Sequence, residues 1–240
     1  MRPNRSQVGF FMADAEPRLV IFDCDGVLVD SEPISISVLV RAMSDLGVSI
    51  TEDQAYERFL GRSLATLIDT LETEFNIHAG EEFLERIRTD LYARFRTELK
   101  PIEGIAATID GLGIPCCVAS SSQMERIRLS LSVTGLLDRL PDIFSATMVK
   151  RGKPAPDLFL HAARQMHVEP GSCLVIEDSP AGIAAAKAAG MTVFAFTGGS
   201  HANFAGYRAE LDRLSPDVVF DAMPELIHLV RNHKLDGTAI

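Results

Sequence analysis

The sequence predicts a doubly wound α/β core, a parallel sheet with helices on both faces, and an α-helical cap domain inserted after the first strand. Short apolar runs alternate with amphipathic helical patterns along most of the chain. The apolar runs are continuous, as in strands that are buried on both faces of a parallel sheet. Residues 31–99 break the alternation, because they contain several helical patterns and no convincing strand.

The strands of the core follow from short apolar runs bounded by turn residues. These runs lie at 18–22, 115–119, 173–177, 192–196 and 218–220, with a weaker one near 143–145. Helical patterns separate them. One apolar stripe consists of Leu158, Phe159, Ala162, Ala163 and Met166. Another runs from Ile183 to Ala189 and stops at Gly190, which is typical of a helix C-cap.

The cap is predicted from helical stripes within residues 31–99. One stripe consists of Ile34, Val38, Leu39, Ala42, Met43 and Leu46, and another of Phe83, Leu84, Ile87, Leu91 and Phe95. The core then comprises residues 17–30 and 100–240, preceded by a loose tail over residues 1–16. We expect hinges at the loop after the first strand and near Lys100-Pro101.

Composition limits the partners of this chain. With 240 residues it is long enough for one good core and one small accessory domain. Its net charge of −10 disfavours nucleic acids and anionic membrane surfaces. No apolar run approaches the ~20 residues of a membrane helix, and the apolar stretch at 8–12 is too short for a secretory signal. We therefore expect a cytoplasmic monomer or weak homodimer.

The cysteines are predicted to be reduced core thiols. All lie in or next to apolar strand runs: Cys24, Cys116, Cys117 and Cys173. Such positions suit small buried residues better than a disulfide framework. No C-x-x-C spacing is present, which argues against a zinc site.

Two carboxylates, Asp23 and Asp25, come directly after the first strand and are followed by Gly26. Open α/β sheets place their active sites at the carboxyl ends of the strands. A carboxylate can attack phosphorus as a nucleophile, and a second one can move protons for the same reaction. An isolated pair of this kind is more often a solvated turn, but three further polar motifs follow in order.

The second and third motifs suit phosphate binding. The Ser120-Ser121 turn follows an apolar run, and its hydroxyls with backbone N–H groups at the next helix can hold phosphate oxygens. Lys153 lies in a Gly-Lys-Pro-Ala-Pro-Asp segment, in which Pro154 favours extended backbone at the lysine. A fixed ammonium there can neutralise an attacking carboxylate and a phosphate together.

The fourth motif is Glu177-Asp178, after the run Cys173–Ile176. Adjacent acids at a strand end suit a hard cation such as Mg²⁺, which prefers oxygen ligands. Ser179-Pro180 then opens a helix with residues typical of the N-cap and N1 positions.

Taken in order, the four motifs resemble those of the haloacid dehalogenase superfamily of phosphotransferases, over about residues 17–232. The sequences of Phe22–Glu32 and of Ile176–Ala186 closely resemble those of its β-phosphoglucomutase-like subfamily, which has a Rossmann-like core and a small helical cap. The resemblance implies Asp23 as nucleophile and Asp25 as general acid/base. No histidine lies in the four motifs, so none is expected to replace Asp25.

The resemblance also implies the remaining site residues. Phosphate and substrate would be bound by Ser120, Ser121, Lys153 and Arg62. Mg²⁺ would be held by Asp23, the Asp25 backbone carbonyl and Asp178, with Glu177 bound directly or through water. Gly61-Arg62-Ser63 is either a cap loop facing the active site or a plain helix–helix turn.

Three functions are compatible with this resemblance. The first is a Mg²⁺-dependent phosphatase of small phosphorylated metabolites, namely sugar or polyol phosphates, with 6-phosphogluconate among them. The second is a phosphosugar mutase, and the third is a catalytically silent binding protein. Every catalytic residue is present, which disfavours the third. Ser35, Leu64 and Gln123 stand where similar mutases carry histidine, arginine and lysine, so a distal phosphate is poorly held and the phosphatase is favoured.

Overall fold

The computed structural model describes residues 16–59, 64–203 and 207–232. Its strands are β1 (Leu19–Phe22), β2 (Cys116–Ser120), β3 (Ile143–Ser145), β4 (Cys173–Glu177), β5 (Thr192–Phe196) and β6 (Val218–Phe220). Its α-helices are α1 (Glu32–Asp45), α2 (Glu52–Phe59), α3 (Leu64–Phe75), α4 (Glu81–Glu98), α5 (Ile105–Leu112), α6 (Met124–Val133), α7 (Asp157–Gln165), α8 (Pro180–Ala188), α9 (Tyr207–Arg213) and α10 (Leu226–Asn232). The described residues also form the short 3₁₀ helices η1 (Ala146–Met148), η2 (Pro170–Ser172), η3 (Ser200–Asn203) and η4 (Met223–Glu225).

The strands form a six-stranded parallel sheet in the order β3-β2-β1-β4-β5-β6. The first strand lies near the centre, where Val20 pairs with Cys116 of β2 on one side and Leu174 of β4 on the other. Every residue of β1 is fully buried, which is why its sequence is a continuous apolar run. The strand β2 extends to Ser120, one residue beyond the predicted end.

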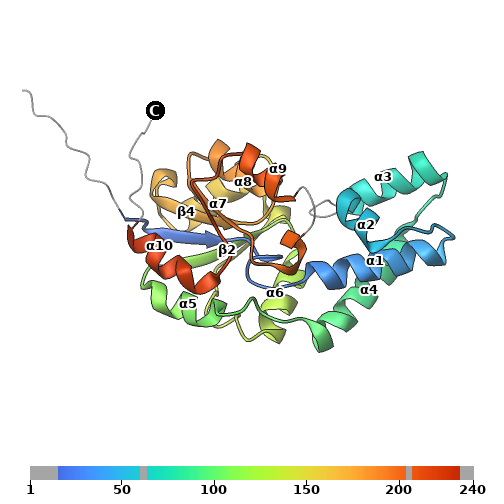
Figure 1. Cartoon of the computed structure of the whole chain (residues 1–240), viewed down its shortest axis with the longest axis horizontal. Helices are drawn as coiled ribbons and strands as arrows, with labels where there is room; N and C mark the ends of the chain where they lie inside the picture. The colour runs from blue at the N-terminus through green and yellow to red at the C-terminus, as the bar shows by residue number, and fades with distance from the viewer. Residues whose placement is uncertain (1–15, 60–63, 204–206, 233–240) are drawn as a thin grey trace, which may run out of the picture.

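Helices cover both faces of the sheet, so the predicted doubly wound architecture is confirmed. One face packs against α5, α6 and α10 through residues that include Phe22, Ile127 and Leu226. The other face packs against α7, α8 and α9 through residues that include Ile21, Phe159 and Ile183. Figure 1 shows these two sets of helices on opposite sides of the strands. Successive residues of β1 face opposite layers because side chains alternate along a strand.

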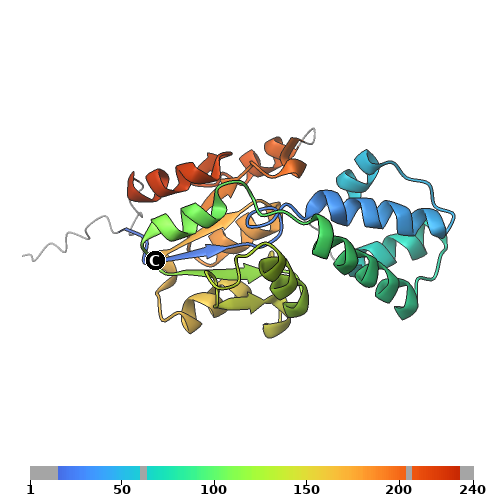
Figure 2. The same ribbon diagram turned by 90° about the horizontal axis from the view of Figure 1, so that it is seen from below.

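The helical cap is formed by α1 to α4, which lie together beside the carboxyl ends of the strands (Figure 2). Within it, Met43 of α1, Leu71 of α3 and Phe95 of α4 are almost completely buried. These side chains belong to the same apolar cluster as the α5, α6 and α10 face of the sheet. The cap therefore has its own packed interior and is joined to the core by continuous apolar contact.

The chain crosses between sheet and cap at two neighbouring segments. The Asp30 backbone N–H donates to the Lys100 carbonyl at 3.0 Å, and Ile102 N–H donates to the Leu28 carbonyl at 3.0 Å. An antiparallel bridge between Val29 and Pro101 lies between these bonds. The two crossings thus form a short two-stranded connection, which we call the crossing ribbon (28–30 and 100–102).

The structure also bears on two further expectations, the state of the cysteines and the absence of a membrane helix. Cys24, Cys117 and Cys173 are free and buried, and Cys116 is half-buried, as the prediction of core thiols requires. Within the described residues, no helix has both the length and the apolar character that a membrane crossing demands.

Candidate active site

The carboxyl ends of the central strands bring the predicted acidic residues together with Lys153. Asp23 follows β1, Ser120 ends β2, and Glu177 ends β4. Lys153 comes from the loop between η1 and α7 and reaches across this edge of the sheet. Because β1 is flanked by β2 and β4, three segments that are distant in sequence meet at one place.

Lys153 is the centre of a buried ion-pair network. Its Nζ lies 2.6 Å from Asp23 Oδ1 and 2.6 Å from Glu177 Oε1, and it donates a third bond to the Ala119 carbonyl at 3.0 Å. Its side chain is 3% exposed. Burial opposes its charge, but Asp23 and Glu177 outweigh this and raise the pKa of Lys153. The lysine is therefore a fixed cation at neutral pH.

Glu177 has both carboxylate oxygens engaged. Oε1 accepts from Lys153, while Oε2 accepts from the backbone N–H groups of Asp178 at 2.9 Å and Ser179 at 2.8 Å. The Ser179 hydroxyl donates to the same oxygen at 3.0 Å and also accepts from Gly182 N–H as the N-cap of α8. A Cβ at Gly182 would lie 1.7 Å from Glu177 Oε1, so only glycine lets the helix approach this closely. Glu177 is thus a rigidly held carboxylate.

Asp178 lies beside Glu177 and contacts a histidine that no motif contains. Its Oδ2 is 2.9 Å from Nε2 of His201, which belongs to η3 after β5. The Tyr207 hydroxyl donates to the Asp178 backbone carbonyl. Burial raises the pKa of Asp178, and the hydrogen bond from His201 opposes the rise. Burial also works against a charged His201, but Asp178 prevails and raises the pKa of that histidine.

Asp25 is held by three donors on the side facing the cap. The Ser31 hydroxyl donates to Oδ1 at 2.7 Å, the Ser122 hydroxyl to Oδ2 at 2.7 Å, and Arg126 Nη2 to Oδ1 at 2.8 Å. Burial favours the neutral acid, but the Arg126 charge and these hydrogen bonds outweigh it and lower the pKa of Asp25. Asp25 is therefore ionised in this structure.

Arg126 lies at the boundary between core and cap. It stands in the first turn of α6, and its guanidinium carbon is 5.3 Å from the Phe95 ring centroid of α4. Its Nη2 is also 3.3 Å from the Ser35 hydroxyl of α1. Nearby Glu32 is partly buried, and burial together with the charge of Asp25 raises its pKa to about 7. Arg126 thus joins the acid/base candidate to two helices of the cap.

Three buried carboxylates at this site are suited to a cation. Asp23, Glu177 and Asp178 each offer an oxygen, and these oxygens lie within 4.8 Å of one another. Burial raises the pKa of Asp23 well above its ordinary value; Lys153 opposes this, and the charges of Glu177 and Asp178 reinforce it. The charge of Lys153 is therefore too little for three carboxylates, and an all-oxygen donor set fits a further hard cation such as Mg²⁺.

The haloacid dehalogenase-like hydrolase family matches residues 20–196, which include all of these strand-end residues. This chain belongs to that family. The 6-phosphogluconate phosphatase of Escherichia coli (strain K12) is 34% identical over 76% of this chain and 83% of its own length. Hexitol phosphatase B of the same strain is 30% identical over 71% of this chain and 79% of its length. Within its family the chain is therefore a phosphatase, a phosphoric monoester hydrolase.

A solved structure shows the same fold in this family. A HAD family hydrolase from Deinococcus radiodurans R1 with bound phosphate and sodium superposes with a TM-score of 0.72 at 33% identity. The match covers 88% of this chain and 94% of that one. The agreement extends beyond the 20–196 match and includes most of the chain described here.

The structure places the other predicted residues of this hydrolase less centrally. Ser120 is 1% exposed, and its hydroxyl accepts from Ser122 N–H at 3.1 Å. Ser121 is exposed in the same turn. Arg62, with its neighbours Gly61 and Ser63, lies outside the described residues, so its role stays a prediction. Arg126 and His201 are the residues that the motifs missed.

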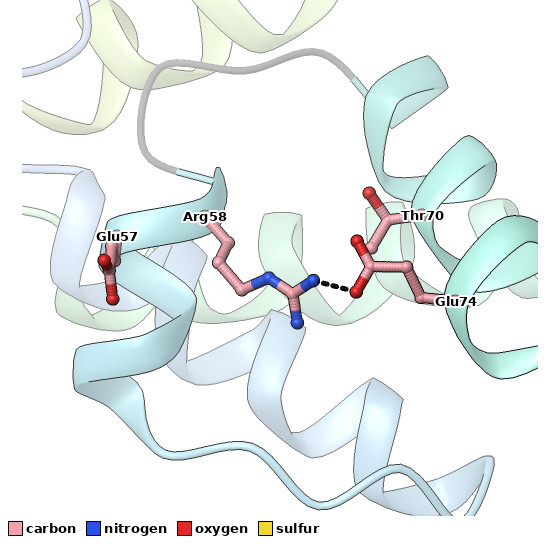
Figure 3. Close-up of a pocket in the computed structure, with 4 residues that line it drawn as sticks. All are labelled: Glu57, Arg58, Thr70 and Glu74. Carbon is pink, nitrogen blue, oxygen red and sulfur yellow. Dashed lines mark hydrogen bonds and ion pairs between the residues drawn. The ribbon is translucent and has the colours of Figure 1, made fainter.

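The cap of this hydrolase contains a cavity of about 410 Å³ between α2 and α3. Its lining residues are Glu57, Arg58, Thr70 and Glu74. Arg58 forms an ion pair with Glu74 across it (Figure 3). Because this partner already matches the Arg58 charge, the four lining residues offer no free cation for a phosphate. None of the strand-end residues lines this cavity.

Proposed function

We propose that this chain is a Mg²⁺-dependent phosphatase that hydrolyses small phosphorylated sugars or polyols through an aspartyl-phosphate on Asp23. One observation carries the proposal: Asp23 lies 2.6 Å from the buried ammonium of Lys153 at the carboxyl end of the central strand. The ammonium opposes the rise that burial causes in the pKa of Asp23, and it offers a positive charge to an incoming phosphate.

Asp25 is the proposed proton carrier. In the first half-reaction, an Asp23 oxygen bonds to phosphorus as the ester oxygen leaves with a proton from Asp25. In the second, Asp25 takes a proton from the water that cleaves the aspartyl-phosphate. Arg126 holds Asp25 ionised, which is the form needed to accept that proton. Asp25 ends the second half-reaction with the proton taken from water, and it can give this proton to the ester oxygen of the next substrate once it exchanges Arg126 for that oxygen.

The proposed metal ligands are Asp23, Asp178 and the backbone carbonyl of Asp25. Glu177 has both oxygens committed to Lys153, Ser179 and the Asp178 amide, so we assign it a contact through water. When bound, Mg²⁺ neutralises charge on the nucleophile and acts as a Lewis acid at a phosphoryl oxygen. Ser120 and Ser121 are the proposed phosphate-binding turn, and residues 31–99 the cap that covers the substrate.

The substrate class rests on the relatives. One is named for 6-phosphogluconate and another for hexitol phosphates, so phosphorylated sugars, sugar acids and polyols are the proposed substrates.

The cations near Asp25 bear on the mutase alternative. Arg126 is a cation on the cap side, but Asp25 already occupies it, and Ser35 contributes only a hydroxyl. The phosphatase remains the better supported function. Buried free cysteines suit a reducing compartment, and we propose the cytoplasm.

The decisive experiment is a phosphate-release screen with Mg²⁺ over 6-phosphogluconate, hexitol phosphates and aldose phosphates. We expect turnover on at least one of them, loss of turnover in EDTA, recovery with Mg²⁺ and inhibition by Ca²⁺, whose looser coordination spoils the geometry. Glucose 1-phosphate with a bisphosphate primer should give inorganic phosphate or no reaction. Formation of glucose 6-phosphate faster than phosphate would favour the mutase, and no turnover on any substrate would favour the silent binding protein.

A further inference from the structure

His201 is a buried side chain outside the four motifs. It lies in η3, directly after the Gly198-Gly199-Ser200 loop that follows β5. Its side chain is 0% exposed, that of Asp178 is 7% exposed, and its Nε2 is 2.9 Å from Asp178 Oδ2. The loop is tied to the crossing ribbon, because Ser200 N–H donates to Asp30 Oδ1 at 3.2 Å. The histidine is therefore held in place from both sides.

The hydrogen bonds around Asp178 determine which nitrogen of His201 carries a proton. The Tyr207 hydroxyl uses its one proton on the Asp178 backbone carbonyl. Its oxygen, 3.1 Å from His201 Nε2, can then only accept. Carboxylate Oδ2 also accepts, so Nε2 must carry a hydrogen and donate. This holds whether the ring is neutral or charged.

The backbone leaves room for this pair only because two nearby residues lack side chains. Gly26 has φ +83°, and a Cβ there would lie 1.9 Å from Asp178 Oδ2 and 2.8 Å from His201 Cε1. A Cβ at Gly199 would lie 2.7 Å from His201 Cε1. The loops after β1 and β5 thus close around the contact between carboxylate and imidazole.

The other ring nitrogen argues against a purely structural histidine. His201 Nδ1 is buried and has no hydrogen-bond partner among the described residues. Leaving a buried polar atom unpaired is unfavourable, so packing alone does not explain a histidine here. The side chain directs its bonded nitrogen at Asp178, while the described residues donate no hydrogen bond to Asp178 Oδ1.

We propose that His201 is a positioning residue for the cation, which holds Asp178 by Oδ2 and so presents Oδ1 to Mg²⁺. This inference rests on the proposed function, in which Asp178 is a metal ligand. Groups that hydrogen-bond a ligating carboxylate fix its orientation, and their loss typically weakens metal binding about 10–100-fold. His201 itself touches neither substrate nor metal in this role.

Two amide variants of His201 separate the effect of the hydrogen-bond donor at Nε2 from the effect of side-chain shape. In His201→Gln the amide nitrogen falls near the place of Nε2, whereas in His201→Asn it falls near that of Nδ1. We expect His201→Asn to weaken Mn²⁺ binding about 10–100-fold, measured without substrate by the EPR signal of free Mn²⁺. His201→Gln should stay within about threefold of wild type. His228→Gln, on the exposed face of α10, serves as the matched control and should not change the affinity.

The outcomes distinguish this inference from the proposed function. If Asp178→Asn binds Mn²⁺ as wild type does, the metal site itself is wrong. If Asp178→Asn loses binding while His201→Asn keeps it, only the role of His201 is wrong. Equal weakening in the Asn and Gln variants would show that the donor at Nε2 is not what matters. If neither His201 variant melts cooperatively in EDTA, His201 is a folding residue and the inference is rejected.

Discussion

Replacing Lys153 by methionine tests the buried network at the centre of the site. The variant removes the ammonium that lies 2.6 Å from both Asp23 and Glu177 while keeping most of the side-chain volume. Two buried carboxylates are then left facing each other without a cation. Removing one partner of a buried ion pair typically costs about 3–5 kcal/mol. At about 2–4 °C per kcal/mol for a protein of this size, the melting temperature should fall by about 6–20 °C.

The size of this effect should depend on pH. In the variant, Asp23 loses the cation that opposes the effect of burial, so its pKa, which burial already raises in the wild type, rises further. The folded variant then binds protons more tightly, and it loses stability as the pH rises. We expect a small difference from wild type near pH 5 and a large one at pH 7.5. Excess Mg²⁺ should recover part of the loss, because it restores positive charge.

The assay is thermal unfolding of both proteins in EDTA at pH 5 and pH 7.5, followed by a Mg²⁺ titration. Phosphate release on a substrate found by the screen is measured in parallel and should be lost. Lys150→Met is the matched control, since that lysine is exposed three residues away. A shift below about 2 °C at pH 7.5, or equal shifts at both pH values, would refute the reasoning.

Three further predictions address individual side chains. Asp23→Asn removes the attacking carboxylate and should lower phosphate release by at least about 10⁴-fold. It should not lower the melting temperature, because burial already disfavours the charged form of this side chain. Activity within a few-fold of wild type would show that Asp23 is not the nucleophile. Glu32→Gln should be more stable than wild type at pH 8 by up to about 3 kcal/mol in urea unfolding. The pKa of Glu32 is about 7 in the folded protein, against an ordinary value of 4.5, so the wild type loses stability as the pH rises from 4.5 to 7. A difference in unfolding free energy between variant and wild type that does not change with pH would contradict this. Arg126→Met should raise the pKa of Asp25 and move the acid limb of the pH–rate profile upward, whereas an unmoved limb would leave Arg126 without influence on Asp25.

The strands and the main acidic residues could be predicted because both depend on local sequence. Strands buried on both faces are continuous apolar runs, and β4 and β5 match the predicted 173–177 and 192–196. The carboxyl-end rule for parallel strands then places Asp23 and Glu177 at one edge. The end of β2 differed by one residue, because Ser120 is buried and still pairs with Ser145 of β3.

The partners of Asp25 and Asp178 could not be predicted from local pattern. Arg126 lies in a helix whose sequence shows no motif, and it reaches Asp25 only because α6 packs beside the cap. His201 left a usable signal: it follows β5 in a glycine-rich polar loop, the same kind of position as the four motifs. Applying the carboxyl-end rule to every strand would have identified it.

The crossing ribbon has a consequence for how such chains diversify. Because the backbones of Asp30 and Lys100 are hydrogen bonded to each other, the two ends of the inserted segment lie side by side. The entropy of closing a loop there grows by only about 0.6 kcal/mol for each doubling of its length. The connection between the sheet and the inserted segment can therefore stay the same when the inserted segment changes in length or sequence. A helical segment grafted from another family member between these two residues, with serine kept at position 31 to hold Asp25, would exchange the proposed substrate-covering part as a unit and leave the phosphoryl chemistry in place.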